Sequence, residues 1–134
     1  MIDNIVISEN DADNDIDISK LPADFVFGAV NVNHNEHAYC KVRFDSHSVN
    51  WFKDNLHHVH PLTRAAVWRN FWILTQDKQI TSLQYMDFVQ KQLVHETVEQ
   101  IITVGLMTLS TLIFEYLPID VAAEKEHALF DILV

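Results

Sequence analysis

From residue 46 onward, apolar residues recur at helical spacing, and this period limits the fold more than any other feature of the sequence. Two prolines divide the region, because Pro61 suits the first turn of a helix and Pro118 ends one. The sequence predicts five helices, at about 46–60, 61–74, 81–93, 96–117 and 120–134. Short connections between them favour antiparallel neighbours. The expected fold is mainly α, with stacked helical hairpins in a solenoid-like arrangement.

Polar residues that can cap a helix precede two of these apolar patterns. Ser46 or Ser48 is expected to cap the first helix, and Thr81 or Ser82 the third. The apolar positions of the first three helices are Val49, Phe52 and Leu56; Leu62, Ala65, Ala66, Trp68, Phe71, Trp72 and Leu74; and Leu83, Met86, Val89 and Leu93. We expect these residues to face a shared core.

The first 45 residues show β-prone runs instead, at 5–7, 25–32 and 39–44. In the last run, Tyr39, Lys41 and Arg43 alternate with Cys40, Val42 and Phe44, which is the period of a half-buried strand. Two or three short strands are marginal in water by themselves, so they need a surface to pack on. The sequence thus predicts a β-strand segment over residues 1–45 and an α-helical domain over residues 46–134.

Charge and cysteine content exclude several classes of function. The net charge is −10, of which residues 1–24 contribute −6, and an acidic loop lies at 9–17. The nine Lys and Arg residues are scattered among nineteen acids, which argues against nucleic acid or an anionic membrane as a partner. Residues 100–114 are uncharged but too short and too rich in hydroxyl groups to span a membrane. A lone cysteine and no secretory signal favour a cytoplasmic protein.

Two acidic motifs resemble metal sites without completing them. The carboxylates Asp11, Asp13, Asp15 and Asp17 alternate as in a calcium loop, but the glycine at the sixth position and the glutamate at the twelfth are absent. The segment His95-Glu96-Thr97-Val98-Glu99 differs from the zinc motif HExxH because a glutamate replaces the second histidine. We therefore favour a solvated acidic loop for the first and a polar edge between helices for the second.

Two histidine groups remain as candidates, one formed by His34 and His37 with Cys40, the other by His57, His58 and His60. A structural zinc would need ligands from both groups, and we favour turn and helix-end residues instead. The aromatic residues Trp51, Trp68, Phe71 and Trp72 could line a ligand site, but their helical spacing favours the core. No nucleophile is paired with a base in the sequence. We assign no catalytic, cofactor-binding or metal-binding residue.

One ordered series of motifs resembles a known family. A strand ending in Asn33, a polar turn, the strand motif Tyr39-x-Lys41-Val42-x-x-Asp45, a helix, and then Pro61-Leu62-x-Arg64-Ala65-x-x-Trp68 follow one another. This order is similar to the C-terminal part of zinc aminopeptidases of the aminopeptidase N and puromycin-sensitive type. The resemblance implies that the strands close a small β-sandwich and that the helix beginning near Arg64 opens a large α-helical domain.

The resemblance also limits what the chain is expected to do. Members of the family bind zinc through HExxH and a later glutamate, and hold the substrate amino terminus with a Gly-x-Met-x-Asn loop. This sequence contains none of these motifs, so whether it is an enzyme stays uncertain and no activity is expected from it alone. The resemblance implies a non-catalytic fragment or homologue, whose helical domain packs over the active site and shapes peptide access.

The end of the chain is still apolar, which predicts an incomplete helical domain and a protein partner. The residues expected at this contact are Phe130, Ile132, Leu133 and Val134. The alternative is a stand-alone helical interaction module, or a small structural subunit of a larger assembly.

Overall fold

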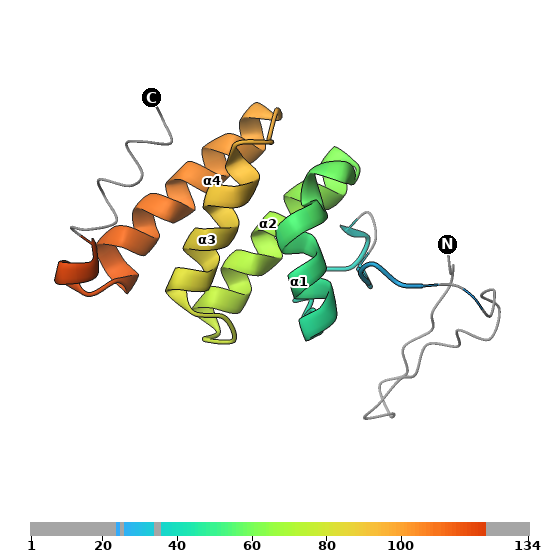
Figure 1. Cartoon of the computed structure of the whole chain (residues 1–134), viewed down its shortest axis with the longest axis horizontal. Coiled ribbons are helices and arrows are strands. Elements are labelled where there is room, and N and C mark those ends of the chain that lie inside the picture. Colours follow the sequence, from blue (N-terminus) through green and yellow to red (C-terminus); the bar gives the residue numbers. More distant parts are fainter. Residues whose placement is uncertain (1–23, 25, 34–35, 123–134) are drawn as a thin grey trace.

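The protein is described here by a computed structural model that covers residues 24, 26–33 and 36–122 (Figure 1). Its helices are α1 (Ser46–Asn55), the 3₁₀ turn η2 (Leu56–His58), α2 (Pro61–Gln76), α3 (Ser82–Leu93), α4 (Glu99–Thr111) and the π-helical turn η3 (Leu112–Tyr116). A further helix begins at residue 119 and is described as far as residue 122. The prediction of a mainly helical fold is confirmed.

The helices lie beside one another, roughly in chain order, from one end of the molecule to the other (Figure 1). Contacts join α1 to α3, α2 to both α3 and α4, and α3 to α4. Connections of a few residues reverse the chain between successive helices, as expected for helical hairpins. Because these helices do not by themselves establish a repeat array, the solenoid-like arrangement stays a prediction.

The helix starts follow local side-chain chemistry, with one correction. Asp45, and neither Ser46 nor Ser48, is the N-cap of α1, since its carboxylate accepts the backbone N–H of Ser48. Pro61 stands at the start of α2, as predicted. Thr81 caps α3, as predicted, and forms a reciprocal capping box with Gln84.

The fourth helix starts later and ends differently than expected. We predicted a helix at 96–117, but α4 begins at Glu99 because Val98 is its N-cap and the preceding residues form a loop. After Thr111 the chain continues as the π-helical turn η3, in which Leu112 is buried and Phe114 is 77% exposed. Pro118 follows this turn and ends the element, as predicted.

Aromatic side chains from α2 and α3 form the centre of the core. The rings of Phe71 and Phe88 stack with centroids 4.2 Å apart, and Trp68 lies 4.9 Å from Phe88. On α4, Gly105 lets the backbone approach Trp68, because a Cβ at this position would lie 2.9 Å from the indole ring. The expected core positions Leu62 and Leu83 are instead 45% and 51% exposed, since they lie on the outer edges of their helices.

No strand is present in the described residues ahead of α1, so the predicted strands at 25–32 and 39–44 are not confirmed there. The alternation holds for Val42 and Phe44, which are buried, while Lys41 and Arg43 are exposed. Cys40 was expected inward and is exposed. A strand requires a neighbouring strand, and the backbone of residues 41–44 makes no hydrogen bond within the described chain. The predicted run at 5–7 lies outside the described residues.

Candidate functional site

A buried ion pair joins the first turn of α2 to the loop between α3 and α4. The guanidinium of Arg64 donates from Nε and Nη2 to the two carboxylate oxygens of Glu96, each at 2.9 Å. A third donor, Nη1, reaches the carbonyl oxygen of Val59 at 2.9 Å. The side chains of Arg64 and Glu96 are 11% and 1% exposed. This bidentate geometry fixes the α3–α4 loop against the start of α2.

Glu96 also organises the start of α4. Its Oε1 accepts the backbone N–H groups of Thr97 and Val98, at 2.9 and 3.0 Å. Burial alone would raise the pKa of Glu96, but the hydrogen bonds from Arg64, Val98 and Thr97 outweigh burial and hold the pKa below its ordinary value. The carboxylate is therefore charged at neutral pH and fully engaged with protein donors.

The structure also shows how the segment that resembles the zinc motif HExxH is folded. The segment from His95 to Val98 is a loop, and only Glu99 belongs to α4, so the motif does not present its ligands on one helical face. Both oxygens of Glu96 already accept hydrogen bonds. Glu96, which would serve as the base in a complete HExxH motif, is instead held as a charged side chain between α2 and the α3–α4 loop.

The histidines after α1 lie in a turn and at a helix start, which agrees with the turn and helix-end positions favoured from the sequence. The ring of His57 lies 3.9 Å from that of His58 and 4.8 Å from that of His95, measured between centroids. His60 instead caps α2, since its Nδ1 accepts the N–H of Leu62. Within the described part of the chain, no three potential ligands are placed to hold a metal ion.

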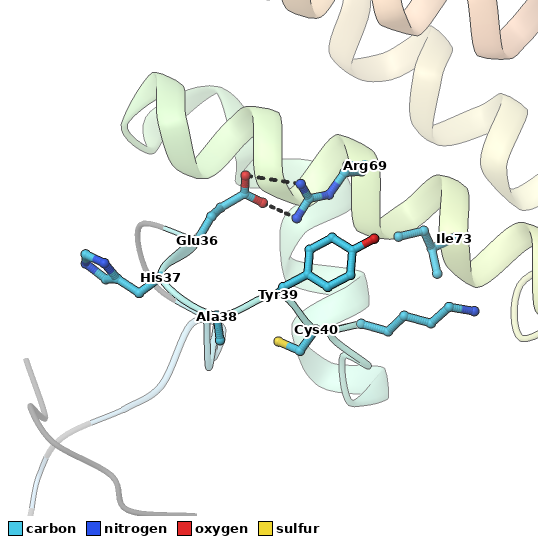
Figure 2. Close-up of a pocket in the computed structure, with 8 residues that line it drawn as sticks. Glu36, His37, Ala38, Tyr39, Cys40, Arg69 and Ile73 are labelled. Atoms are coloured by element: carbon cyan, nitrogen blue, oxygen red, sulfur yellow. Dashed lines mark hydrogen bonds and ion pairs between the residues drawn. The ribbon is translucent and has the colours of Figure 1, made fainter.

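An open hollow of about 680 Å³ lies between the loop before residue 41 and α2 (Figure 2). Its lining residues are Glu36, His37, Ala38, Tyr39, Cys40, Lys41, Arg69 and Ile73. Arg69 of α2 forms an ion pair with Glu36, and Lys41 pairs with Asp77 at 3.0 Å. Glu36 and Arg69 of the lining are thus paired with each other, Lys41 is paired with Asp77 outside the lining, and Tyr39 is fully exposed beside them.

The loop on this hollow is held by one amide side chain. Asn33 is 8% exposed, its Nδ2 donates to the carbonyl oxygen of Ala38, and its Oδ1 accepts the N–H of the same residue. Glu36, at the corner of the turn, has a positive φ of 55°. The N–H of Glu36 also donates to the carbonyl oxygen of Asn33 at 3.0 Å, and Glu36 lies against Arg69.

The remaining candidates lie apart from one another. His37 and Cys40 are exposed at the hollow, away from the histidines around His57, whereas His34 and residues 11–17 lie outside the described chain. Trp68 and Phe71 are in the core, as favoured; Trp51 and Trp72 are half-buried. Sequence reasoning missed the pairing of Arg64 with Glu96, because 32 positions separate them and no local pattern links them.

The described helices include none long and apolar enough to cross a bilayer. The ion pair, the capped helix starts and the paired charges at the hollow all connect one element of the chain to another. Chemically, the arrangement holds the start of α2 against the α3–α4 loop and the loop before residue 41 against α2.

A sequence model of the ERAP1-like C-terminal domain matches residues 29–129, which is more than half of the chain. The match includes the segment ahead of α1, the ion pair and all of the named helices. It confirms the resemblance to the C-terminal region of zinc aminopeptidases of the aminopeptidase N type. None of the curated proteins or solved structures compared with the chain matches it. The chain is a member of the ERAP1-like C-terminal domain family.

Proposed function

We propose that this chain is a non-catalytic helical domain of an aminopeptidase N-type enzyme, packed beside the catalytic part and shaping which peptides reach the active site. The observation that carries the proposal is the segment at residues 41–44, which makes no backbone hydrogen bond within the described part of the chain and is anchored on the helices by Val42 and Phe44. Family membership supports the same role. Catalysis would then depend on zinc held elsewhere, since the segment from His95 to Glu99 lacks the second histidine of HExxH.

The extended segment has the features of a sheet edge that requires a partner strand. Val42 and Phe44 point into the core, with Phe44 at 5.1 Å from Phe52 between ring centroids. The exposed apolar side chains nearby are Val26 at 87%, Val32 at 58% and Tyr39 at 110%. An extended backbone with free N–H and C=O groups favours pairing with another strand. We assign this edge to the closing strand of a β-sandwich, as the family resemblance implies.

Residues 28 and 30, which precede this segment in the chain, are also fastened to α1. The N–H of Val30 donates to the hydroxyl of Ser48 at 2.9 Å, and that hydroxyl donates to Asp45. Gly28 packs so closely on Trp51 that a Cβ there would lie 2.6 Å from the indole nitrogen. These contacts support a structural joint between a sandwich and a helical stack.

The test uses an aminopeptidase of this family from which the C-terminal helical domain has been removed. Hydrolysis of peptides of increasing length is measured with and without the purified chain, in the presence of zinc. We expect no hydrolysis by the chain alone and a changed ratio of long-peptide to short-peptide rates when both are present. Chelator-sensitive hydrolysis by the chain alone, or an unchanged ratio, would contradict the proposal.

Two variants locate the contact in this assay. Arg43→Pro removes a backbone donor from the extended edge and should abolish the effect on peptide selection, whereas Arg43→Ala should retain it. Met107→Asp, on the outer side of α4, serves as a remote control and should also retain the effect. Loss of the effect in Met107→Asp alone would place the contact on α4 instead.

A second candidate is a stand-alone interaction module that binds the apolar face of another protein. It is favoured by the outer side of α4 and η3, where Val104 and Met107 of α4 are 47% and 65% exposed and Phe114 of η3 is 77% exposed. No charged side chain occurs from residue 100 to 114. The residues predicted from sequence to contact a partner, Phe130, Ile132, Leu133 and Val134, lie outside the described chain. Met107→Asp should weaken such binding while Arg43→Pro leaves it intact. A cytoplasmic location, inferred from the lone Cys40, is part of the proposal.

A further inference from the structure

The segment at residues 41–44 has a basic outer face and an apolar inner face. Lys41 and Arg43 are exposed, whereas Val42 and Phe44 are buried against the helices. Side chains alternate between the two faces of an extended chain, so the segment offers two cations on one face and two apolar side chains on the other. A strand that fits beside it needs the complementary order, with acids on the outer face and apolar side chains on the inner face.

One stretch of the same chain, outside the described residues, has this complementary order. In residues 15–18, Asp15 and Asp17 alternate with Ile16 and Ile18. A register that places Ile16 beside Val42 also places both aspartates on the face of the basic side chains. This holds whether the two strands run parallel or antiparallel, because opposite residues share a face in both cases.

Neighbouring stretches of the first 23 residues fit the segment less well. Residues 5–7 are apolar at every position, so they offer no acid to the basic face. Residues 11–14 also alternate, but Ala12 and Asn14 supply little apolar surface for the inner face. The complementary pattern is therefore confined to residues 15–18.

The charges of the two segments also favour the contact. Residues 1–24 carry a net charge of −6. Arg43 forms no ion pair within the described part of the chain, and Lys41 pairs only with Asp77, in an exposed contact that contributes little to stability. Aspartate is disfavoured in strands, so residues 15–18 become extended only where cations and an apolar face compensate.

We propose that residues 15–18 pair with residues 41–44 as an internal strand, which shields this edge until a strand of another protein replaces it. Covering an edge in this way prevents unwanted pairing with other chains. Residues 19–40 connect the two stretches and are long enough for a strand pair of either direction.

The internal pair is expected to be weak enough to exchange. Closing the loop of residues 19–40 has an entropic cost, and two exposed ion pairs offset only part of it. The edge is therefore partly shielded in the chain alone and stays accessible to a longer partner strand. The displacement step rests on the proposed function, whereas the shielding does not.

The shielding is tested by amide hydrogen exchange at residues 41–44 in the full chain alone. Asp15→Lys/Asp17→Lys reverses both charges and should lower amide protection within 41–44 by about fivefold. Asp11→Lys/Asp13→Lys is the matched control, with the same spacing and the same change in net charge, and should leave this protection unchanged. Equal protection in the unaltered chain and in Asp15→Lys/Asp17→Lys would overturn the proposal, as would an equal loss in the control.

A compensating substitution tests direct pairing. Arg43→Asp, added to Asp15→Lys/Asp17→Lys, restores an opposite charge across the pair and should raise protection again by about twofold. No recovery in this combined variant would contradict pairing between the two segments.

The displacement step is tested with an aminopeptidase that lacks its C-terminal helical domain. Asp15→Lys/Asp17→Lys should bind it about fivefold more tightly than the unaltered chain, because the internal strand competes less, and Asp11→Lys/Asp13→Lys should bind as the unaltered chain does. Equal affinity of all three chains would overturn displacement. Absence of binding by every chain would overturn the proposed function, while exchange in the chain alone would still decide the shielding.

Discussion

At the residue scale, the ion pair of Arg64 with Glu96 shows what the arginine of the motif Pro61-Leu62-x-Arg64-Ala65 contacts in the folded chain. The arginine that opens α2 binds the carboxylate that also holds the N–H groups at the start of α4. One buried pair therefore positions three elements, namely the end of η2 through Val59, the start of α2 and the start of α4. Replacement of Arg64 or Glu96 should therefore weaken the contacts among these three elements more than it weakens the neighbouring helix.

Glu96→Gln tests this role. The change leaves the guanidinium of Arg64 largely buried without a carboxylate, and removing one partner of a buried pair destabilises a protein by about 3 kcal/mol. Urea unfolding at neutral pH measures the loss. The double variant Arg64→Met/Glu96→Met should lose less than the sum of the two single changes, because it leaves no unpaired charge. Additive losses would contradict direct coupling of the two residues.

The pair also predicts an acid response with a defined sign. The folded pKa of Glu96 lies below its ordinary value, so its stabilising effect is complete above the unfolded value of about 4.3 and is lost as pH falls through the folded pKa. Acid unfolding of the Glu96→Gln variant should therefore be flatter below about pH 4.3 than that of the unaltered chain. Parallel curves would show that Glu96 does not contribute.

Asp45 is a second residue with a specific role. Its carboxylate caps α1 and accepts from both the N–H and the hydroxyl of Ser48, and these hydrogen bonds lower its pKa. Asp45→Ala should cost about 1 kcal/mol of unfolding free energy. Ser46→Ala, at the alternative cap position, should change stability by less than about 0.5 kcal/mol. Reversed magnitudes in urea unfolding would favour Ser46 as the cap.

At the element scale, the helices differ in how far the sequence alone could locate them. The starts of α2 and α3 were predicted because Pro61 and the Thr81 cap act on their own neighbourhoods. We predicted the start of α4 too early. Glu96 lies in the loop ahead of α4 and binds Arg64, which is 32 positions away in the sequence, so its neighbours alone do not reveal this contact. The π-helical turn η3 has no local sequence signal that we can identify.

The extended segment shows the other limit of sequence reasoning. Its alternation predicted the burial of Val42 and Phe44 correctly, since burial depends on which face meets the helices. Hydrogen bonding in a strand depends instead on a neighbouring strand, which no residue of the segment specifies. The ring contact of His57 with His95 was missed for the same reason as the ion pair, since it forms only in the folded chain.

Contact between α2 and α4 predicts the effect of a substitution at Gly105. Ala is favoured over Gly in a helix by about 1 kcal/mol, but its methyl group would lie 2.9 Å from the buried ring of Trp68. Overpacking of this kind costs about 1–3 kcal/mol, so Gly105→Ala should be neutral to destabilising and should shift the fluorescence of Trp68. Ser110→Ala, on the exposed side of α4, is the control and should be neutral or slightly stabilising. Clear stabilisation by Gly105→Ala would contradict the close approach.

At the scale of the whole molecule, the chain has an apolar surface at each end of its helical stack. One end carries the extended segment with Val26, Val32 and Tyr39 exposed; the other carries α4 with Met107 and Phe114 exposed. A domain placed between a β-sandwich and further helices would have both surfaces covered. This is the arrangement that we propose, and in it the ion pair of Arg64 with Glu96 would keep the two surfaces in a fixed relation.

The central claim is that the extended edge receives a strand from an aminopeptidase. Its most direct test is amide hydrogen exchange of residues 41–44, measured in the chain alone and after addition of an aminopeptidase that lacks its C-terminal helical domain. The account predicts that at least two of these amides, which make no backbone hydrogen bond within the described chain, become protected on mixing. Unchanged exchange at residues 41–44, with protection appearing only on α4 or nowhere, would contradict it.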